Sequence, residues 1–279
     1  MPWQHARRAQ HQSNQRIKND YNEEDICSYH TGGGSINPIC CAGAQSRTQK
    51  IINAALKGWN IELRAGYNIG GTSPIPLPAE IREIKSYKPS VGFSGEADFT
   101  RFFDKHWGVG FGVKLENKNM ETDARVKNYG MEILSEGAVA SGRWTGGVKT
   151  SVRNSFLSFP IVGVYKVHPR TNLKLGVFLS YLIEGKFDGF VYDGYLRNGD
   201  PTGEKAVFTG DATATYDFSD ELRKFQWGLQ AGVDWEAFKH LKLYADLSWG
   251  LNSAFPESFK TITFSMYPIY FNVGVGYLF

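Results

Sequence analysis

The charged residues with the most regular spacing in this chain fall at alternate positions of short segments. Alternate residues of a β-strand share one face, so this spacing predicts acidic and basic side chains gathered on a common face. Charges enclosed away from water must pair, because an unpaired buried charge is costly. The expected chemistry is ion pairing, either as a salt-bridged plug or along a narrow path for small solutes. These residues are Glu62, Arg64, Glu96, Asp98, Lys114, Glu116, Lys174, Glu184, Asp234, Glu236, Lys242 and Asp246.

Residues for catalysis or metal binding are poorly placed. Of the six histidines, three lie in the amino-terminal tail, and His106, His168 and His240 lie in predicted short turns. A histidine-based nucleophile relay therefore lacks a base in the long connections, and the turn histidines lack an arranged carboxylate partner. We expect no cofactor, no metal and no enzymatic activity. The acidic residues of 187–224 have no organised calcium-loop spacing and predict a solvated surface. They include Asp188, Asp193, Asp200, Glu204, Asp211 and Asp217.

Eight segments with a two-residue period position the charged residues. In each segment one face is apolar or aromatic, and the other is small, polar or charged, which is typical of strands. Pro160 has no backbone donor, so we expect a bulge at that position or a later start of its strand. The segments are 59–69, 91–99, 107–116, 156–167, 173–184, 227–236, 242–249 and 269–279.

The connections between these segments alternate in length. Short turns follow the second, fourth and sixth segments, at 101–106, 168–172 and 238–240. Long connections follow the others, and the two longest, 117–151 and 187–224, are polar and glycine-rich and predict loops. An even number of strands with short turns at one end is typical of outer-membrane barrels, whose short turns are periplasmic and whose long loops are extracellular.

The apolar face is expected to contact lipid. A lipocalin-like soluble barrel has the same alternation, but the other face is rich in glycine, as a crowded interior requires. Aromatic residues also occur at both ends of the apolar face. Trp227 and Trp235 lie eight residues apart, which at a tilt near 40° is roughly 20 Å of height, close to an apolar band of about 25 Å. The girdle residues are Trp59, Trp107, Tyr165, Trp235 and Phe279 near the turns, and Tyr67, Tyr181, Trp227 and Trp249 near the loops. The fold class predicted is all-β, an eight-stranded antiparallel transmembrane up-and-down β-barrel.

The last segment ends on an aromatic residue. A terminal phenylalanine with an aromatic residue two positions earlier resembles the closing strand of Gram-negative outer-membrane barrels, where it is the usual assembly signal. The resemblance implies recognition by the barrel-assembly machinery. The residues concerned are Phe271, Val273, Val275, Tyr277 and Phe279.

Two further stretches resemble the outer-membrane β-barrel family that includes PorT. They are the proline-rich stretch 70–81 and the stretch 217–222 that leads into Phe225–Gly228. The resemblance implies an integral, multi-pass outer-membrane location and a part in protein secretion, and it brings no catalytic residue. Pro74, Pro76 and Pro78 are expected to stiffen their segment into an extended form, as a rigid lid over the barrel mouth or as a docking segment.

Residues 1–57 differ from the barrel segment 58–279. The first part is polar without a period and predicts disorder, whereas Ala42-Gly43-Ala44 has the form of a signal-peptidase site before Gln45. The charged and apolar segments that should precede such a site are missing, so we hypothesise a misassigned start, with a chance match as the alternative. All three cysteines lie in this tail, which excludes a disulfide framework in the barrel.

Composition agrees with a β-barrel in an envelope. The chain has 279 residues with 31 glycines, and its net charge of +3 does not indicate a nucleic-acid partner. No apolar run is long enough for a membrane helix. We expect a non-enzymatic structural or accessory component that contacts lipid and other envelope proteins. The alternatives are a narrow channel for small solutes and a lipid-modifying enzyme.

Overall fold

The computed structural model describes residues 57–135, 138–210 and 212–279. The predicted tail, with its cysteines and the site beside Ala44, lies outside these residues except for Lys57. No helix in the described residues is long and apolar enough to span a membrane. The elements there are β1 (Asn60–Pro74), β2 (Ile81–Lys88), β3 (Gly92–Phe102), β4 (Trp107–Ser135), β5 (Ala138–His168), β6 (Thr171–Asn198), β7 (Lys205–Phe208), β8 (Ala214–Asp217), the 3₁₀ turn η1 (Ser219–Glu221), β9 (Phe225–Phe238), β10 (Leu241–Gly250) and β11 (Met266–Leu278).

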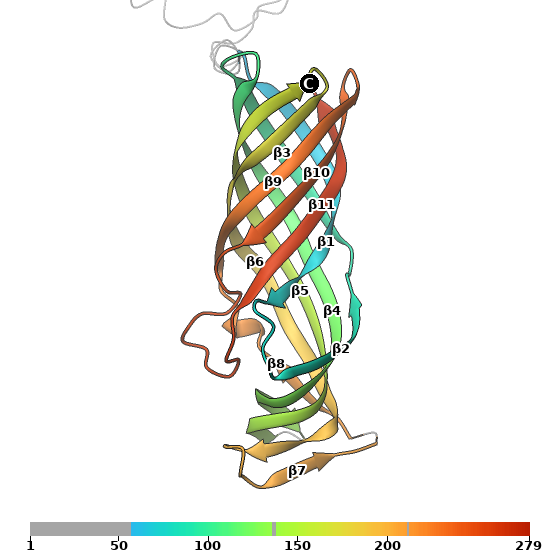
Figure 1. Ribbon diagram of the computed structural model, residues 1–279, viewed down its shortest axis with the longest axis vertical. Coiled ribbons are helices and arrows are strands. Elements are labelled where there is room, and N and C mark those ends of the chain that lie inside the picture. The colour runs from blue at the N-terminus through green and yellow to red at the C-terminus, as the bar shows by residue number, and fades with distance from the viewer. Residues whose placement is uncertain (1–56, 136–137, 211) are drawn as a thin grey trace, which may run out of the picture. The chain divides into compact units, whose positions relative to one another are not determined.

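Eight of the described strands close into an antiparallel ring (Figure 1). Around the ring the order is β1, β3, β4, β5, β6, β9, β10 and β11. The last strand then pairs with the first, from Glu62 opposite Leu278 to Pro74 opposite Met266. Closure gives each strand of the ring a paired neighbour on both sides, which a membrane-spanning sheet requires. The ring confirms the predicted antiparallel barrel and its short turns.

The apolar rows of the ring face outward. Trp227, Trp235, Phe271 and Val275 each expose between 44 and 48% of their surface. Neighbouring positions on the same strands, such as Asp234 and Asn272, are buried. A water-soluble barrel would not expose a continuous apolar belt of this kind. The arrangement fits hydrocarbon outside and a packed polar interior.

The sheet continues well beyond this belt on the side of the long connections. Asn117, Ser155 and Glu184 are register partners on β4, β5 and β6, and they lie one step beyond the apolar partners Leu115 and Leu157. We call the part of the molecule beyond the row Asn117, Ser155 and Glu184 the extension. It includes β2, β7 and β8, which pair only with β4 or β6.

The extension encloses an apolar core, unlike the ring. Its inner side chains come from the continued strands, from β8 and from residues 251–265, and several aromatic pairs join them, including Phe187 with Phe255 at 5.0 Å. Burying this apolar surface stabilises the extension outside the membrane. The fully or nearly fully buried members include Met120, Met131, Ile133, Trp144, Val152, Phe187, Val191, Leu196, Ala214, Tyr216 and Ala254.

The prediction that 117–151 and 187–224 are loops is wrong. Both stretches are mostly strand, and β4 pairs with β5 as far as Ser135 opposite Ala138. The two-residue period is present but changes phase at register shifts, one of them between Val126 and Tyr129. A bulge inserts one residue and moves the following side chains to the other face, so a continuous count of alternate positions misses such a strand.

Two expectations about prolines also fail. β5 passes through Pro160 without a bulge. The register of β5 against β6 is the same on both sides of Pro160, with Phe159 opposite Leu179 and Ile161 opposite Val177. The register shift lies between Ser155 and Phe156 instead. The segment from Ile75 to Glu80 bends and turns rather than running extended.

Candidate functional site: a charged lumen next to an apolar core

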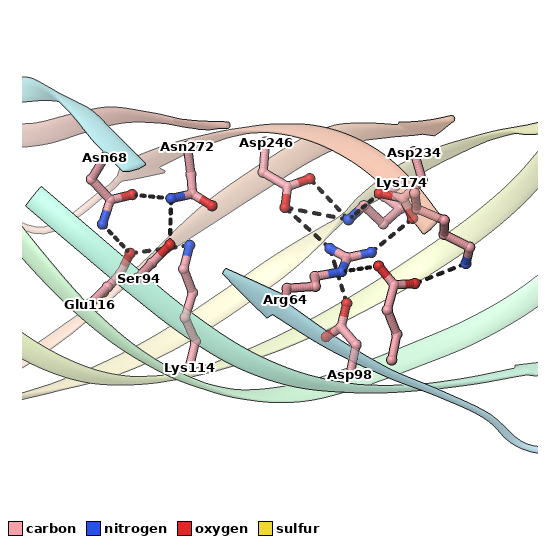
Figure 2. Close-up of polar contacts among 12 residues, drawn as sticks. Arg64, Asn68, Ser94, Asp98, Lys114, Glu116, Lys174, Asp234, Asp246 and Asn272 are labelled. Carbon is pink, nitrogen blue, oxygen red and sulfur yellow. Dashed lines mark hydrogen bonds and ion pairs between the residues drawn. The ribbon is translucent and has the colours of Figure 1, made fainter. Parts of the chain in front are cut away.

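Arg64 on β1 is the centre of the barrel interior, and its side chain is 2% exposed. Its Nε donates to Glu62 Oε1 at 2.8 Å, and Nη2 donates to Asp234 Oδ2 at 2.9 Å. Nη1 lies 3.0 Å from Asp98 Oδ2 and 3.4 Å from Asp246 Oδ2. One guanidinium thus joins carboxylates from four strands (Figure 2). A planar group with five donors suits this role.

Two lysines complete this cluster. Lys174 Nζ lies 2.9 Å from Asp234 Oδ1 and 3.0 Å from Asp246 Oδ1. Lys242 Nζ lies 2.8 Å from the second oxygen of Glu62. Each of these carboxylates therefore contacts two cations, which offsets part of the cost of removing the charges from water.

A second cluster surrounds Glu116, one step nearer the extension. Its carboxylate contacts Lys114 at 3.2 Å and Lys118 at 2.9 Å, and it accepts a hydrogen bond from Ser158 at 2.7 Å. Asn68 Nδ2 also donates to Glu116, at 3.3 Å. The amide of Asn272 donates to Asn68 and to Ser94, so the cluster spans several strands (Figure 2).

Lys118 lies at the end of the charged lumen nearest the extension. Its ammonium lies 5.1 Å from the ring centroid of Phe156, 5.3 Å from that of Phe178 and 5.6 Å from that of Tyr270. Aromatic faces attract a cation while they exclude water. Lys118 therefore joins the ion pairs on one side to the apolar core of the extension on the other.

Particular glycines make room for the carboxylates. A Cβ added at Gly112 would collide with Asp98, one at Gly232 with Asp246, and one at Gly276 with Glu62. Gly112 and Gly232 lie directly opposite Asp98 and Asp246 on neighbouring strands, whereas Gly276 lies opposite Arg64 and diagonal to Glu62. The abundance of glycine on the inner face thus has a local cause, which is close approach of a charged side chain.

The structure places ten of the predicted charged residues inside the barrel, each buried. Glu184 does not belong with them, because the register shift beside Ser155 leaves it exposed on the outer face. Glu236 is only half-buried at the end with the short turns. Sequence reasoning missed Lys118, although it continues the spacing of Lys114 and Glu116. The interior residues are Glu62, Arg64, Glu96, Asp98, Lys114, Glu116, Lys174, Asp234, Lys242 and Asp246.

The predicted girdle residues lie on the outer surface at two heights. Trp107 stacks at a tilt on Tyr165, with centroids 4.7 Å apart, near the short turns. At the other height Tyr67 contacts Phe93 and Trp249 pairs with Ile269. Trp59 is half-buried against Phe111, whereas the remaining girdle residues are exposed. They are Tyr181, Trp227, Trp235 and Phe279.

The terminal residues of β11 alternate as expected for a lipid-facing strand. Phe271, Val275, Tyr277 and Phe279 are exposed, and Val273 is half-buried. Tyr277 packs edge-on against Phe279 with centroids 5.0 Å apart. The same strand pairs with both β1 and β10, so it is the one that completes the ring.

The three described histidines lie at the short turns. His106 and His240 stack on Tyr165 and Tyr277 at the short turns. Backbone N–H groups of Trp107 and His106 donate to Asp104 there at 2.6 Å, and they lower the pKa of that carboxyl. No group of three potential metal ligands occurs among the described residues.

The acidic residues of 187–224 have separate roles. Asp188 pairs with Arg153 at 3.2 Å, and Asp200 accepts hydrogen bonds from Thr202 in a turn. Asp217 accepts a hydrogen bond from the backbone of Ser219 at 2.9 Å. Asp193 has positive φ at a register shift between β5 and β6, and Asp211 lies outside the described residues. These contacts are local to turns and strand surfaces.

The solved structures that match this chain have low sequence identity to it. Ail, the attachment invasion locus protein of Yersinia pestis, matches with 10% identity and a TM-score of 0.36, over 79% of this chain and 99% of Ail. Neisserial surface protein A matches with 12% identity and a TM-score of 0.31, over 80% of this chain and 97% of that protein. The outer membrane protease OmpT of Escherichia coli matches with 11% identity and a TM-score of 0.31, over 79% of this chain and 96% of OmpT. No curated protein matches the chain.

A family model gives the assignment directly. The model described as "Outer membrane protein beta-barrel domain" matches residues 43–256, which is most of the chain. The closed ring and its apolar belt agree with that description and with an integral outer-membrane location. The chain belongs to the outer membrane protein beta-barrel domain family.

Proposed function

We propose that this protein is a sealed, non-enzymatic component of the outer membrane that works through its extension. The observation that carries the proposal is the filling of the lumen by paired charges around Arg64 and Glu116. An eight-stranded barrel has just enough interior for its own side chains. The apolar core on the extension side of Lys118 adds a second layer across the same path.

Exposed apolar residues of the extension support a role in contacting other envelope proteins. Leu134 and Val139 are cross-strand partners near the end of the β4–β5 hairpin, and they expose 47% and 66% of their surface. They lie far from the lipid belt, so lipid does not account for their exposure. In the PorT-like setting that the sequence resemblance implies, the barrel would be an accessory of a secretion assembly rather than its conduit.

Conductance across a planar lipid bilayer tests the sealed lumen. We expect refolded protein to give no discrete current steps. Flotation with liposomes and the gel shift of a folded barrel on heating show that the protein has inserted, so that silence is informative. Discrete steps whose size or ion selectivity changes in Asp246→Asn would instead establish a narrow channel through the charged network.

Co-purification from native membranes tests the role of the extension. The double variant Leu134→Ser and Val139→Ser should lose proteins that co-purify with the wild type. A matched variant at the short turns, Phe103→Ser and Phe238→Ser, removes similarly exposed apolar side chains and should retain them. Loss of the co-purifying proteins only in the variant at the short turns would place the contact at the periplasmic rim. In a separate assay, turnover of lipid by purified protein would support the enzymatic alternative.

A further inference from the structure

The wall of the molecule is open between β1 and β2. β1 pairs with β3 only as far as Asn68 opposite Gly92, and its next residues pair with β11 alone. β2 pairs with β4, from Ile81 opposite Val126 to Lys88 opposite Glu121. No pairing joins β1 to β2 in the described chain. Figure 1 shows β2 set apart from the end of β1, with β4 between and behind them.

A cavity of about 400 Å³ lies at this opening. This volume falls within the usual range for small-ligand pockets, roughly 300–1,000 Å³. Its inner wall comes from the core-facing side of β4 and β5, including Met120, Ala124 and Val148. Leu77 and Ile84 line the cavity and remain 58% and 55% exposed, so the apolar lining reaches the surface. We call this cavity the side pocket.

The side pocket begins at the height of the outer aromatic girdle. Gly71, which lines the pocket, pairs with Ile269 on β11. Ile269 in turn pairs with Trp249, a girdle residue on β10. Ile69, two residues before Gly71, is 41% exposed on the apolar belt. The apolar surface therefore continues from the lipid-facing belt into the pocket without an intervening polar row on β1.

Basic residues lie beside the opening. β2 carries Arg82, Lys85 and Lys88 against one acidic residue, Glu83, and all four are exposed. The ammonium of Lys85 lies 3.2 Å from the hydroxyl of Tyr192, which fixes it at the surface of the extension. A cluster of basic side chains at the membrane surface attracts acidic lipid headgroups.

We propose that the side pocket binds an acyl chain of an acidic lipid from the outer leaflet, with the headgroup beside the basic residues of β2. Continuity of the pocket with the lipid-facing belt supports a lipid as the occupant, and the charge of β2 supports an acidic one. A bound chain would cover apolar side chains that otherwise face water at Leu77 and Ile84. The inference does not depend on a sealed lumen, because none of the charged lumen residues lines the pocket.

Native mass spectrometry of the full chain in detergent tests the proposal, with phosphatidylglycerol and phosphatidylcholine as the added lipids. The wild type should retain one phosphatidylglycerol at concentrations where phosphatidylcholine is retained at least tenfold less. Ala124→Phe and Gly71→Leu fill the pocket from opposite walls, because a Cβ at Gly71 already reaches Met120 and Tyr87. Each should reduce retention at least tenfold.

The control adds bulk away from the pocket. Val207→Phe, on the exposed strand β7 of the extension, should retain lipid like the wild type. Arg82→Gln with Lys88→Gln should abolish the preference for phosphatidylglycerol and leave the acyl site intact. Equal lipid retention by the wild type and both filling variants, each shown to be folded by its gel shift on heating, would overturn the proposal. Bilayer conductance has no bearing on this outcome.

Discussion

The barrel lumen and the extension are built from the same strands with opposite polarity. In the ring, β4 turns Lys114 and Glu116 inward, whereas a few residues later the same face carries Met120 and Val126. The outer face changes in the reverse direction, from Leu115 to Asn117. A strand places its apolar face toward whatever excludes water. In the ring that is hydrocarbon, and in the extension it is the protein's own core.

The change of polarity occurs at one height on three neighbouring strands. Leu115, Leu157 and Tyr181 are register partners on the outer face, where Leu115 and Tyr181 are exposed and Leu157 is half-buried. The next outward row consists of Asn117, Ser155 and Glu184. Because the three strands change together, this row marks the outer limit of the hydrocarbon on this side of the barrel. Lys118 lies inside the barrel at the corresponding height, between the two kinds of interior.

The largest expected effect comes from removing the cation at the centre of the lumen. Arg64→Met leaves Glu62 and three aspartates with fewer cations in a closed space. Breaking a buried pair costs about 3–5 kcal/mol, and here four carboxylates lose the same partner, so we expect a loss at or above that range. Urea unfolding in lipid vesicles, followed by tryptophan fluorescence, measures it.

The control for this change keeps the charge. Arg64→Lys retains one cation but loses the planar fork, so its loss of stability should be intermediate. If Arg64→Met unfolded at the urea concentration of the wild type, the lumen would not depend on pairing. The contrast between the two interiors would then need another explanation.

The next effect separates the two regions. Trp144 is fully buried in the extension, and its indole donates to Gly147 O at 3.2 Å. Trp144→Ala should destabilise the extension by about 3–5 kcal/mol. The ring pairings do not involve this residue, so the barrel should still show its gel shift on heating. Limited proteolysis should cut the variant within the extension only.

If Trp144→Ala lost both the gel shift of the barrel and the protease resistance of the extension, this separation would be contradicted. That result would mean that the apolar core is required for closure of the ring. A useful comparison is Trp227→Ala, because Trp227 is on the lipid-facing belt and should leave the protease resistance of the extension unchanged.

A smaller effect tests the crowding of the lumen. Gly232→Ala places a methyl group against the carboxylate of Asp246, whereas Gly95→Ala adds the same group where no atom lies within 4 Å. Overpacking of an interior costs about 1–3 kcal/mol. We expect a loss of that size for Gly232→Ala and almost none for Gly95→Ala, measured by the same urea unfolding. Equal stability of the two variants would show that the interior has spare room.

The sequence allowed prediction of the ring but not of the extension. Alternation over 107–116 predicts a strand, and the same spacing leads on to Lys118 and Met120. At that point the inner face changes from charge to apolar, and the shift between Val126 and Tyr129 then moves the pattern to the other face. A prediction that assumes one constant polarity for each face of a strand ends the strand there and assigns the remaining residues to a loop. The lumen charges were predictable because they share one period, whereas Glu184 was misplaced by a bulge that nothing in its own spacing indicates.

The smallest effect tests the apolar interior of the extension by pH. Tyr216 is buried there, and its hydroxyl lies 2.6 Å from Thr150 Oγ1 and 3.0 Å from Lys149 O. Burial raises the pKa of Tyr216 well above its ordinary value, because a phenolate would lose its hydration. An unfolded tyrosine ionises near about pH 10. Above that pH the unfolded chain releases a proton that the folded extension keeps, so the stability of the extension is full below it and falls as the pH rises.

Tyr216→Phe should therefore weaken the loss of extension stability above that pH, at a cost of about 1 kcal/mol near neutrality for the lost hydrogen bonds. Burial also raises the pKa of Tyr129, so part of the alkaline slope should remain. Ultraviolet absorbance of phenolate and protease resistance of the extension give the two readouts. Tyr181→Phe changes a tyrosine on the lipid-facing belt and serves as the matched control. An alkaline slope identical in the wild type and Tyr216→Phe would mean that Tyr216 meets water in the folded chain, and the extension would then resemble the lumen more than its apolar lining indicates.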